Sequence, residues 1–273
     1  MLKNFFITAL RTIVRDKGFS LINILGFSIG IACTVLILFW VQDELSYDQS
    51  HQKKDRIYRV LSKVPTGEGM LEAGVTPAAL APMLEEEFPE IQIATRYKGV
   101  GSYTFIHEEK RFSERRCGLA ESKLFSIFTF PFIEGNPRTC LDGPNSIVLT
   151  ESVANRYFED GHAMGEEIEL LGVGVFKVTA VIEDVTHSHF PFNYLIPIKW
   201  AEEFFNDNIE ELGSFNYSTY ILTREEIDAG ALEKKMKPFF NQHADENRTE
   251  NETYSRLFLQ ELTDVYLRSD FSY

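Results

Sequence analysis

The sequence predicts an α+β protein: one N-terminal transmembrane helix followed by a domain of two β-α-β units, with an α+β subdomain inserted between them. Three observations predict this architecture. A run of 23 residues without a carboxylate, lysine, arginine or histidine lies near the N-terminus, a strand–helix–strand pattern occurs at each end of the remaining chain, and more than 100 residues of shorter strands separate the two patterns. A chain of 273 residues is long enough for an anchor and two modest subdomains.

The composition excludes several classes of protein. A hydrophobic share of 44% with 23 phenylalanines excludes an intrinsically disordered chain, and three cysteines are too few for a disulfide-stapled scaffold. The net charge of −14 is divided unevenly, because residues 1–18 carry +3 and the rest of the chain carries −17. This acidic balance argues against a nucleic-acid partner, which requires a basic face.

The apolar run Phe19–Val41 predicts the transmembrane helix, residues 19–41. At about 1.5 Å per residue a helix of this length spans roughly 34 Å, enough for a hydrocarbon core of roughly 30 Å. A cleaved signal peptide is the alternative, but the run is longer than the usual apolar region of about 7–15 residues and no cleavage site follows it. A lipoprotein signal ending at Cys33 is disfavoured by Gly30, since leucine is expected there.

Basic residues flank the N-terminal side of this helix and acidic residues the C-terminal side, so we expect a cytoplasmic N-terminus and a periplasmic domain. Residues 1–18 alternate apolar and basic side chains at helical spacing. This pattern predicts an amphipathic interfacial helix that contacts membrane lipid, with a charged topology signal as the simpler alternative.

A face of small and polar residues follows the transmembrane helix at intervals of three or four. It contains a G-x-x-x-G motif, which allows helix backbones to approach closely, and polar residues at both ends that can bond across a contact. We therefore expect a helix–helix packing face consisting of Asn23, Gly26, Gly30 and Thr34.

The first β-α-β unit is predicted from a β-rich strand at 56–64, a helix with Thr76 as N-cap and Pro77 at its first position, and a strand at 91–97. The second unit is predicted from a strand at 217–222, a helix that begins at the capping box 223–226 and runs toward Ala244, and a strand at 255–262 after a polar loop at 245–253. Between the units the sequence predicts short strands at 103–106, 115–119, 147–149, 167–171, 176–183 and 194–198, and short helices at 122–128 and 151–158.

Catalytic motifs are absent from the sequence. It contains no phosphate-binding loop with its lysine, no G-x-S-x-G elbow and no H-E-x-x-H motif, so we expect no enzyme activity, no catalytic residues and no cofactor. His187 and His189 resemble a metal-binding pair, but two ligands do not complete a site, and a solvated loop over 185–191 is the preferred interpretation, with no metal.

Two features are left with alternatives. Cys117 and Cys140 either form a disulfide, for which the compartment is suitable, or remain buried thiols that pack as small apolar residues. The aromatic stretch 125–132 is either core or an exposed contact surface, and core is the preferred interpretation.

In addition, the chain resembles a known family, the MacB/FtsX-like permeases of bacterial ABC transporters, with their MacB-type periplasmic core domain. The resemblance is carried by motifs that occur in the family's order over nearly the whole chain. These are Leu21–Ala32 in the membrane helix, Tyr47-Asp48 to His51 and Asp55–Val60 after it, Thr76-Pro77, Leu80–Pro82 and Phe88–Glu90, Asn145–Ser152 with Ala154 and Tyr157-Phe158, Gly165-Glu166, Ser188–Phe190 with Phe192, and Leu262–Leu267.

The resemblance implies a periplasmic core domain at 46–273, with porter-like halves at about 46–100 and 210–273 and a sabre-like insertion at about 101–209. It implies a permease subunit, homodimeric or paired with a paralogous permease, in the inner membrane and driven by a separate cytoplasmic ABC ATPase. A periplasmic or outer-membrane partner is a further expectation. In this class the ATPase cycle moves the periplasmic domains during export or extraction of substrates.

Family members carry at least three more membrane helices after this domain, and we expect this chain to be a truncated or split permease. The alternative function is a non-transporting, single-pass periplasmic interaction protein. A periplasmic hydrolase is disfavoured because no triad or metal site is found.

Overall fold

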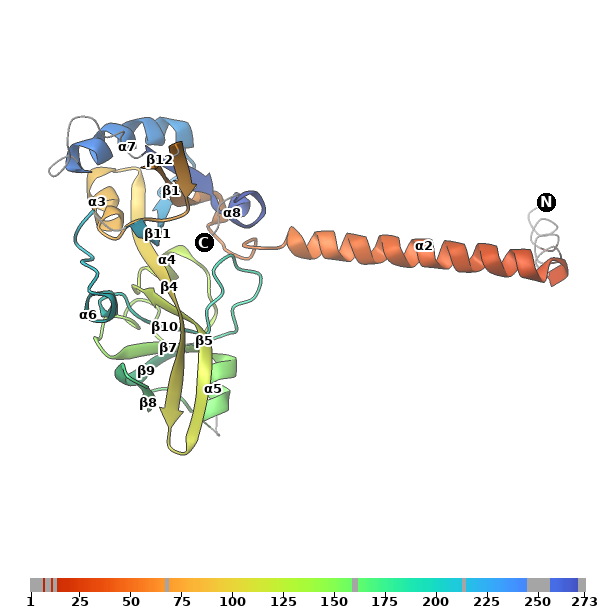
Figure 1. The fold of residues 1–273 in the computed structure, drawn as a ribbon, viewed down its shortest axis with the longest axis horizontal. Coiled ribbons are helices and arrows are strands. Elements are labelled where there is room, and N and C mark those ends of the chain that lie inside the picture. The colour runs from red at the N-terminus through yellow and green to blue at the C-terminus, as the bar shows by residue number, and fades with distance from the viewer. Residues whose placement is uncertain are drawn as a thin grey trace. The chain divides into compact units, whose positions relative to one another are not determined.

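The computed structural model describes residues 7, 11, 14–66, 69–158, 162–212, 215–244 and 256–269 (Figure 1). Two compact units make up the chain, Met1–Ser46 and Tyr47–Tyr273.

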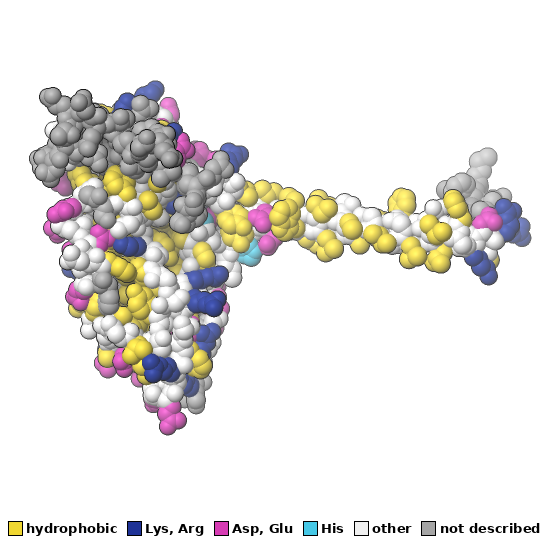
Figure 2. Space-filling model, viewed as in Figure 1, with side chains coloured by type: hydrophobic (Ala, Val, Ile, Leu, Met, Phe, Trp, Pro, Cys, Tyr) yellow, Lys and Arg dark blue, Asp and Glu magenta, His cyan; other side chains and the backbone are white. Residues whose placement is uncertain are grey.

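The first unit contains one long helix, α2 (Lys17–Glu44). None of its residues is buried, and it is long and apolar enough to cross a membrane. Figure 2 shows apolar side chains along its length, with charged side chains only near its two ends. The predicted span 19–41 lies inside α2, whereas the predicted interfacial helix 1–18 falls mostly outside the described residues.

The second unit is built on one sheet with the strand order β12 (Arg256–Glu261), β1 (Ile57–Thr66), β11 (Phe215–Thr223), β4 (Ile91–His107), β5 (Lys110–Ala120), β10 (Tyr194–Pro197), β7 (Ser146–Thr150), β9 (Gly174–Ile182) and β6 (Phe132–Gly135). At one end of the sheet, β11 pairs antiparallel with both β1 and β4, and β1 pairs antiparallel with β12. Strands β1 and β4, joined through α3, are therefore parallel with β11 between them, and β11 and β12, joined through α7, are parallel with β1 between them. These are the two predicted β-α-β units, interleaved as split units. Their elements are β1 (Ile57–Thr66), α3 (Leu80–Glu87), β4 (Ile91–His107), β11 (Phe215–Thr223), α7 (Ala229–Ala244) and β12 (Arg256–Glu261).

The intervening residues extend the same sheet. β4 has 17 residues and pairs with β5 along a long hairpin, so the sheet continues from the split units into the insertion (Figure 1). β10 is parallel to β5, and β7 is parallel to β9. The remaining elements are η1 (Lys54–Arg56), β2 (Gly69–Ala73), β3 (Thr76–Pro77), β5 (Lys110–Ala120), α4 (Leu124–Ile127), β6 (Phe132–Gly135), β7 (Ser146–Thr150), α5 (Glu151–Tyr157), β8 (Glu167–Leu170), β9 (Gly174–Ile182), β10 (Tyr194–Pro197), α6 (Trp200–Phe205) and α8 (Leu262–Arg268).

Two predicted helix starts are wrong, for the same physical reason. Thr76 lies in the short strand β3, where its hydroxyl donates to Thr219 at 2.7 Å instead of capping a helix, and α3 begins later at Leu80. Thr223 ends β11, and its hydroxyl donates to the carbonyl of Glu225, while α7 begins at Ala229. In both cases the threonine hydroxyl donates to another group, on the distant strand β11 for Thr76 and in the following turn for Thr223, and so does not cap a helix.

The core is formed by apolar side chains from both faces of the sheet. The aromatic stretch 125–132 lies in this core as expected: Phe128 is 2% exposed, and Phe125, Phe130 and Phe132 pack against the same cluster. Cys117 and Cys140 are free thiols in the structure, each buried in a different apolar cluster. The polar loop predicted at 245–253 falls outside the described residues.

Candidate functional site

Asp48 lies at the start of the second unit and is completely buried. Its backbone is in the left-handed region with φ 58°, which aspartate tolerates better than most residues. Its backbone N–H donates to the carbonyl of His187 at 2.8 Å. The first residues after the membrane helix are thereby joined to the loop that precedes β10.

The side chain of His189 lies between Asp48 and β11. Its Nδ1 is 2.9 Å from Oδ1 of Asp48, and its Nε2 is 2.7 Å from the hydroxyl of Tyr220. Burial lowers the pKa of His189 below its ordinary value, although the neighbouring carboxylate acts in the opposite direction. The imidazole is therefore neutral at pH 7, with its proton on Nδ1 facing Asp48 and with Nε2 accepting from Tyr220.

His51 approaches the same carboxylate from another direction. Its Nδ1 accepts a hydrogen bond from the backbone N–H of Thr129 at 3.1 Å, so in the neutral ring the proton is on Nε2, which lies 3.7 Å from Oδ1 of Asp48. The ring packs edge-on against Phe128 and Phe130. One buried carboxylate is thus surrounded by two imidazoles and aromatic rings.

These contacts determine the charge of Asp48. Burial by itself raises the pKa of the carboxyl, but the neighbouring imidazoles of His189 and His51 outweigh burial and lower the pKa from 3.8 to about 2. The carboxylate is ionised at neutral pH while both oxygens are excluded from solvent. Its Oδ2 has no hydrogen-bond partner among the described residues. A buried oxygen without a partner costs about 1–3 kcal/mol of stability. The contacts with the two imidazoles are both made by the other oxygen, Oδ1.

The solvated loop predicted at 185–191 is only partly present. His187 is exposed, but Ser188, Phe190 and the side chain of His189 are buried. The two histidines do not face a common point, and within the described ranges no group of three His, Cys, Asp or Glu side chains could hold a metal ion. The local sequence around His189 could not reveal that its side chain is buried, because its partner Asp48 is 141 residues away in the sequence.

A usable signal was nevertheless present in the sequence. The motifs Tyr47-Asp48 to His51 and Ser188–Phe190, both part of the family resemblance, contain the three residues that meet here. An adjacent contact involves Tyr47, whose ring stacks on Tyr266 of α8 with ring centroids 3.6 Å apart. We call Asp48, His51, His189 and Tyr220 the Asp48 network; it ties the chain entering the second unit to β11 and to the loop before β10.

On α2, the predicted packing face lines a shallow groove of about 420 Å³ that includes Gly26, Gly30 and Thr34. A side chain placed at either glycine would meet no atom within 4 Å. The Thr34 hydroxyl donates to the carbonyl of Gly30 at 2.8 Å and is satisfied within the helix. Asn23 is exposed on the same helix. The groove suits a second helix, and that interface stays a prediction.

In the described residues, one apolar helix precedes a sheet of split β-α-β units with an extended insertion. Comparison with known proteins identifies the family. The family of MacB-like periplasmic core domains matches residues 20–239, and the chain belongs to this family.

Individual relatives agree with this assignment. The chain is 25% identical over 276 residues to the uncharacterized ABC transporter permease YvrN of Bacillus subtilis (strain 168), a match that covers 92% of this chain and 64% of that protein. The match therefore spans less than two thirds of the length of this relative.

Two solved structures share the fold. A permease domain from Porphyromonas gingivalis has a TM-score of 0.68 at 22% identity, covering 78% of this chain and 92% of that chain. The periplasmic region of MacB from Actinobacillus actinomycetemcomitans has a TM-score of 0.54 at 14% identity, covering 77% and 89%. The expected family and the α+β fold class are confirmed. The chain is a protein of the ABC transporter permease class with a candidate membrane helix and a periplasmic-type domain.

Proposed function

We propose that the chain is the N-terminal part of a permease subunit that transmits the motion of a separate cytoplasmic ATPase to a periplasmic domain, for export or extraction of a substrate. Membership of the MacB-like family carries this proposal. In this arrangement the N-terminus is cytoplasmic, α2 crosses the inner membrane, and the second unit lies in the periplasm, as the distribution of basic residues favours.

The route of transmission begins at the end of α2. The helix is continuous over 28 residues, and the chain continues through turns in which the backbone N–H groups of Leu45 and Ser46 donate to the carbonyls of Val41 and Asp43. Only a few residues later, the Asp48 network joins the chain to β11. A displacement of a helix passes through a short hydrogen-bonded connection, whereas a long flexible linker would absorb it.

The remaining roles are assigned to partners. ATP hydrolysis belongs to the ATPase subunit and not to this chain, which has no phosphate-binding loop. The groove at Gly26 and Gly30 is assigned to a second permease helix, from a homodimer or a paralogous permease. Membrane lipid surrounds the rest of α2, and a periplasmic or outer-membrane partner completes the assembly.

Co-purification and a distance measurement test this proposal. The full chain is expressed with a candidate ABC ATPase subunit from the same organism, purified in nanodiscs, and spin-labelled at Glu86→Cys on α3 and Arg111→Cys on β5, with Cys33 replaced by alanine. Both labelling positions are exposed, and the other two cysteines are buried. We expect the ATPase to co-purify, and we expect ATP with vanadate to change the distance distribution between the labels.

The alternative function, a non-transporting single-pass interaction protein, predicts a different result. In that case no ATPase co-purifies, or it co-purifies and the distance distribution is the same with and without nucleotide. Asp48→Asn serves as the uncoupled variant, in which we expect the ATPase to remain bound while the nucleotide-dependent change in distance is reduced.

A further inference from the structure

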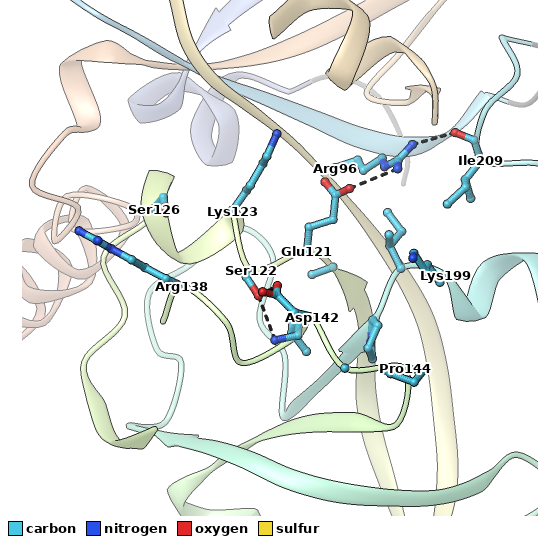
Figure 3. Close-up of a pocket in the computed structure, with 15 residues that line it drawn as sticks. Arg96, Glu121, Ser122, Lys123, Ser126, Arg138, Asp142, Pro144, Lys199 and Ile209 are labelled. Carbon is cyan, nitrogen blue, oxygen red and sulfur yellow. Dashed lines mark hydrogen bonds and ion pairs between the residues drawn. The ribbon is translucent and has the colours of Figure 1, made fainter. Parts of the chain in front are cut away.

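A cleft of about 530 Å³ lies in the second unit, beyond the carboxyl ends of the parallel strands β5 and β10. Its volume is within the range of pockets that bind small molecules, about 300–1,000 Å³. One side is formed by Arg96 of β4 and by Ile209, and the other by the loop 141–144 and by residues 197–199 (Figure 3). The cleft is separate from the Asp48 network, which shares none of its lining residues.

The inner wall of the cleft is apolar. It consists of Ala120, Leu141, Pro144, Pro197 and Ile198. This surface is firmly held, because Ala120 and Pro197 are register partners in the sheet and the indole of Trp200 donates to the carbonyl of Pro144 at 2.7 Å. The inner wall is therefore a preformed apolar surface, as ligand pockets usually have.

Two of the charged side chains that face the cleft neutralise each other. Arg96 donates to the carbonyls of Ala78 and Ile209, both at 2.8 Å, and to Oε1 of Glu121 at 3.2 Å. A third charged group, Lys123, is paired with Glu85 at 2.9 Å, outside the cleft. These groups support the walls, and none of them is free to hold a ligand of opposite charge.

Two other cationic side chains that line the cleft, Arg138 and Lys199, are not paired in this way. The guanidinium of Arg138 and the ammonium of Lys199 have no hydrogen bond or ion pair in the described part of the chain, and both residues are exposed. Figure 3 places them on opposite sides of the cleft, with Glu121, Ser122 and Asp142 between them.

The middle of the cleft has the opposite charge. Asp142 accepts a hydrogen bond from the Ser122 hydroxyl at 2.8 Å and forms no salt bridge with any of the described residues. An anionic group placed between the two cations would be repelled by this carboxylate, whereas an apolar segment would contact the inner wall. The cleft therefore favours a ligand that carries negative charge at its two ends and no charge in its middle.

We propose that the cleft binds an elongated small molecule with an acidic group near each end and an apolar middle, of the α,ω-dicarboxylate class. Arg138 and Lys199 each bind one acidic end, and the inner wall contacts the apolar middle. Charge-assisted hydrogen bonds of this kind are roughly twice as strong as neutral ones. The proposal concerns binding alone and does not depend on coupling to an ATPase.

The chain contains its own reporter for this site. Of its two tryptophans, Trp40 lies in α2 and Trp200 lies next to Lys199 with its indole on the loop that forms the inner wall. The full chain with Trp40→Phe, in nanodiscs of zwitterionic lipid, is titrated with glutarate, suberate and sebacate while Trp200 emission is recorded. Equilibrium dialysis of the same diacids measures binding directly, and 1,10-decanediol is the uncharged probe.

We expect saturable binding that is tighter for the longer diacids than for glutarate, with decanediol at least about tenfold weaker. Arg138→Gln and Lys199→Gln should each weaken diacid binding about tenfold, and Asp142→Asn should tighten it by removing the repulsion. Arg111→Gln, an exposed cation on the β4–β5 hairpin, is the control that should change nothing.

The proposal is overturned if dialysis finds no saturable binding of any diacid. It is equally overturned if the Arg138→Gln, Lys199→Gln double variant binds sebacate as tightly as the unsubstituted chain, or if decanediol binds as tightly as sebacate. Circular dichroism of each variant confirms that the exposed substitutions leave the fold unchanged.

Discussion

The Nδ1 atom of His189 lies 2.9 Å from Oδ1 of Asp48, inside a site that excludes solvent from both side chains. This pair joins the segment that follows the membrane helix to the centre of the sheet, through Tyr220 of β11. The two residues come from two separated motifs of the sequence, Tyr47-Asp48 to His51 and Ser188–Phe190.

Removal of the carboxylate should destabilise the second unit. Asp48→Asn retains the shape of the side chain and its tolerance of positive φ but loses the charge that two imidazoles surround. We expect the free energy of unfolding to fall by about 2–4 kcal/mol. Urea unfolding of the full chain in nanodiscs, followed by circular dichroism, measures the change. Asp55→Asn, at an exposed position nearby, is the matched control, and an equal effect of the two substitutions would contradict a special role for Asp48.

Stability should also depend on pH through the same network. The pKa of His189 is lowered in the folded state, so the unfolded state binds more protons and stability is lost as the pH falls below about 6.5. The pKa of Asp48 is lowered to about 2, so its contribution is full above pH 3.8 and disappears as the pH falls toward 2. Unfolding measured between pH 8 and pH 4 should show the first loss. His189→Gln should flatten that part of the curve, and a curve of unchanged slope would refute the assignment.

The thiols of the second unit should be unreactive. Burial raises the pKa of Cys117 and of Cys140 to about 12, so little thiolate is present at neutral pH and the reagent has no access. In a Cys33→Ala chain we expect no labelling by a maleimide until urea unfolds the protein, and then two labels per chain. A reductant should leave the melting temperature unchanged, whereas a lowered melting temperature would indicate a disulfide between the two cysteines.

The small-residue face of α2 should mediate helix association. Gly26→Ile together with Gly30→Ile would fill the groove that the two glycines leave open, and we expect a lower yield of membrane crosslinking between permease chains. Gly18→Ile, at the start of the helix and away from this groove, is the control. An unchanged crosslinking yield in the double variant would rule out this face as the interface.

The orientation of the chain can be tested by labelling in intact spheroplasts. A thiol reagent that cannot cross membranes should reach a cysteine placed at Gln49 and not one placed at Asn4, because the basic flank retains the N-terminus in the cytoplasm. Labelling at both positions after permeabilisation is the control. The reverse pattern would require the second unit to be cytoplasmic.

What the sequence determined by itself is the part of the structure that depends on local pattern. The uncharged run 19–41 specifies a helix because every backbone group must be satisfied within the segment when lipid is the solvent, and α2 contains that run. Short apolar runs specified buried strands such as β7 and β10, which lie close to their predicted ranges. The helix start at Thr76 failed because strand pairing brings its hydroxyl to Thr219, and the start at Thr223 failed because its hydroxyl bonds the carbonyl of Glu225 in a turn after β11.

Only the tertiary structure decided which distant groups meet. The loop that contains His189 was predicted to be solvated, and the imidazole is buried because it lies against the carboxylate of Asp48 and the hydroxyl of Tyr220, from two other parts of the chain. The cleft between Arg138 and Lys199 likewise depends on a loop and a strand end that are far apart in the sequence. The physical reason is the same in both cases: burial and the pairing of charges are properties of the folded arrangement, and local sequence does not contain the identity of a partner that is distant along the chain.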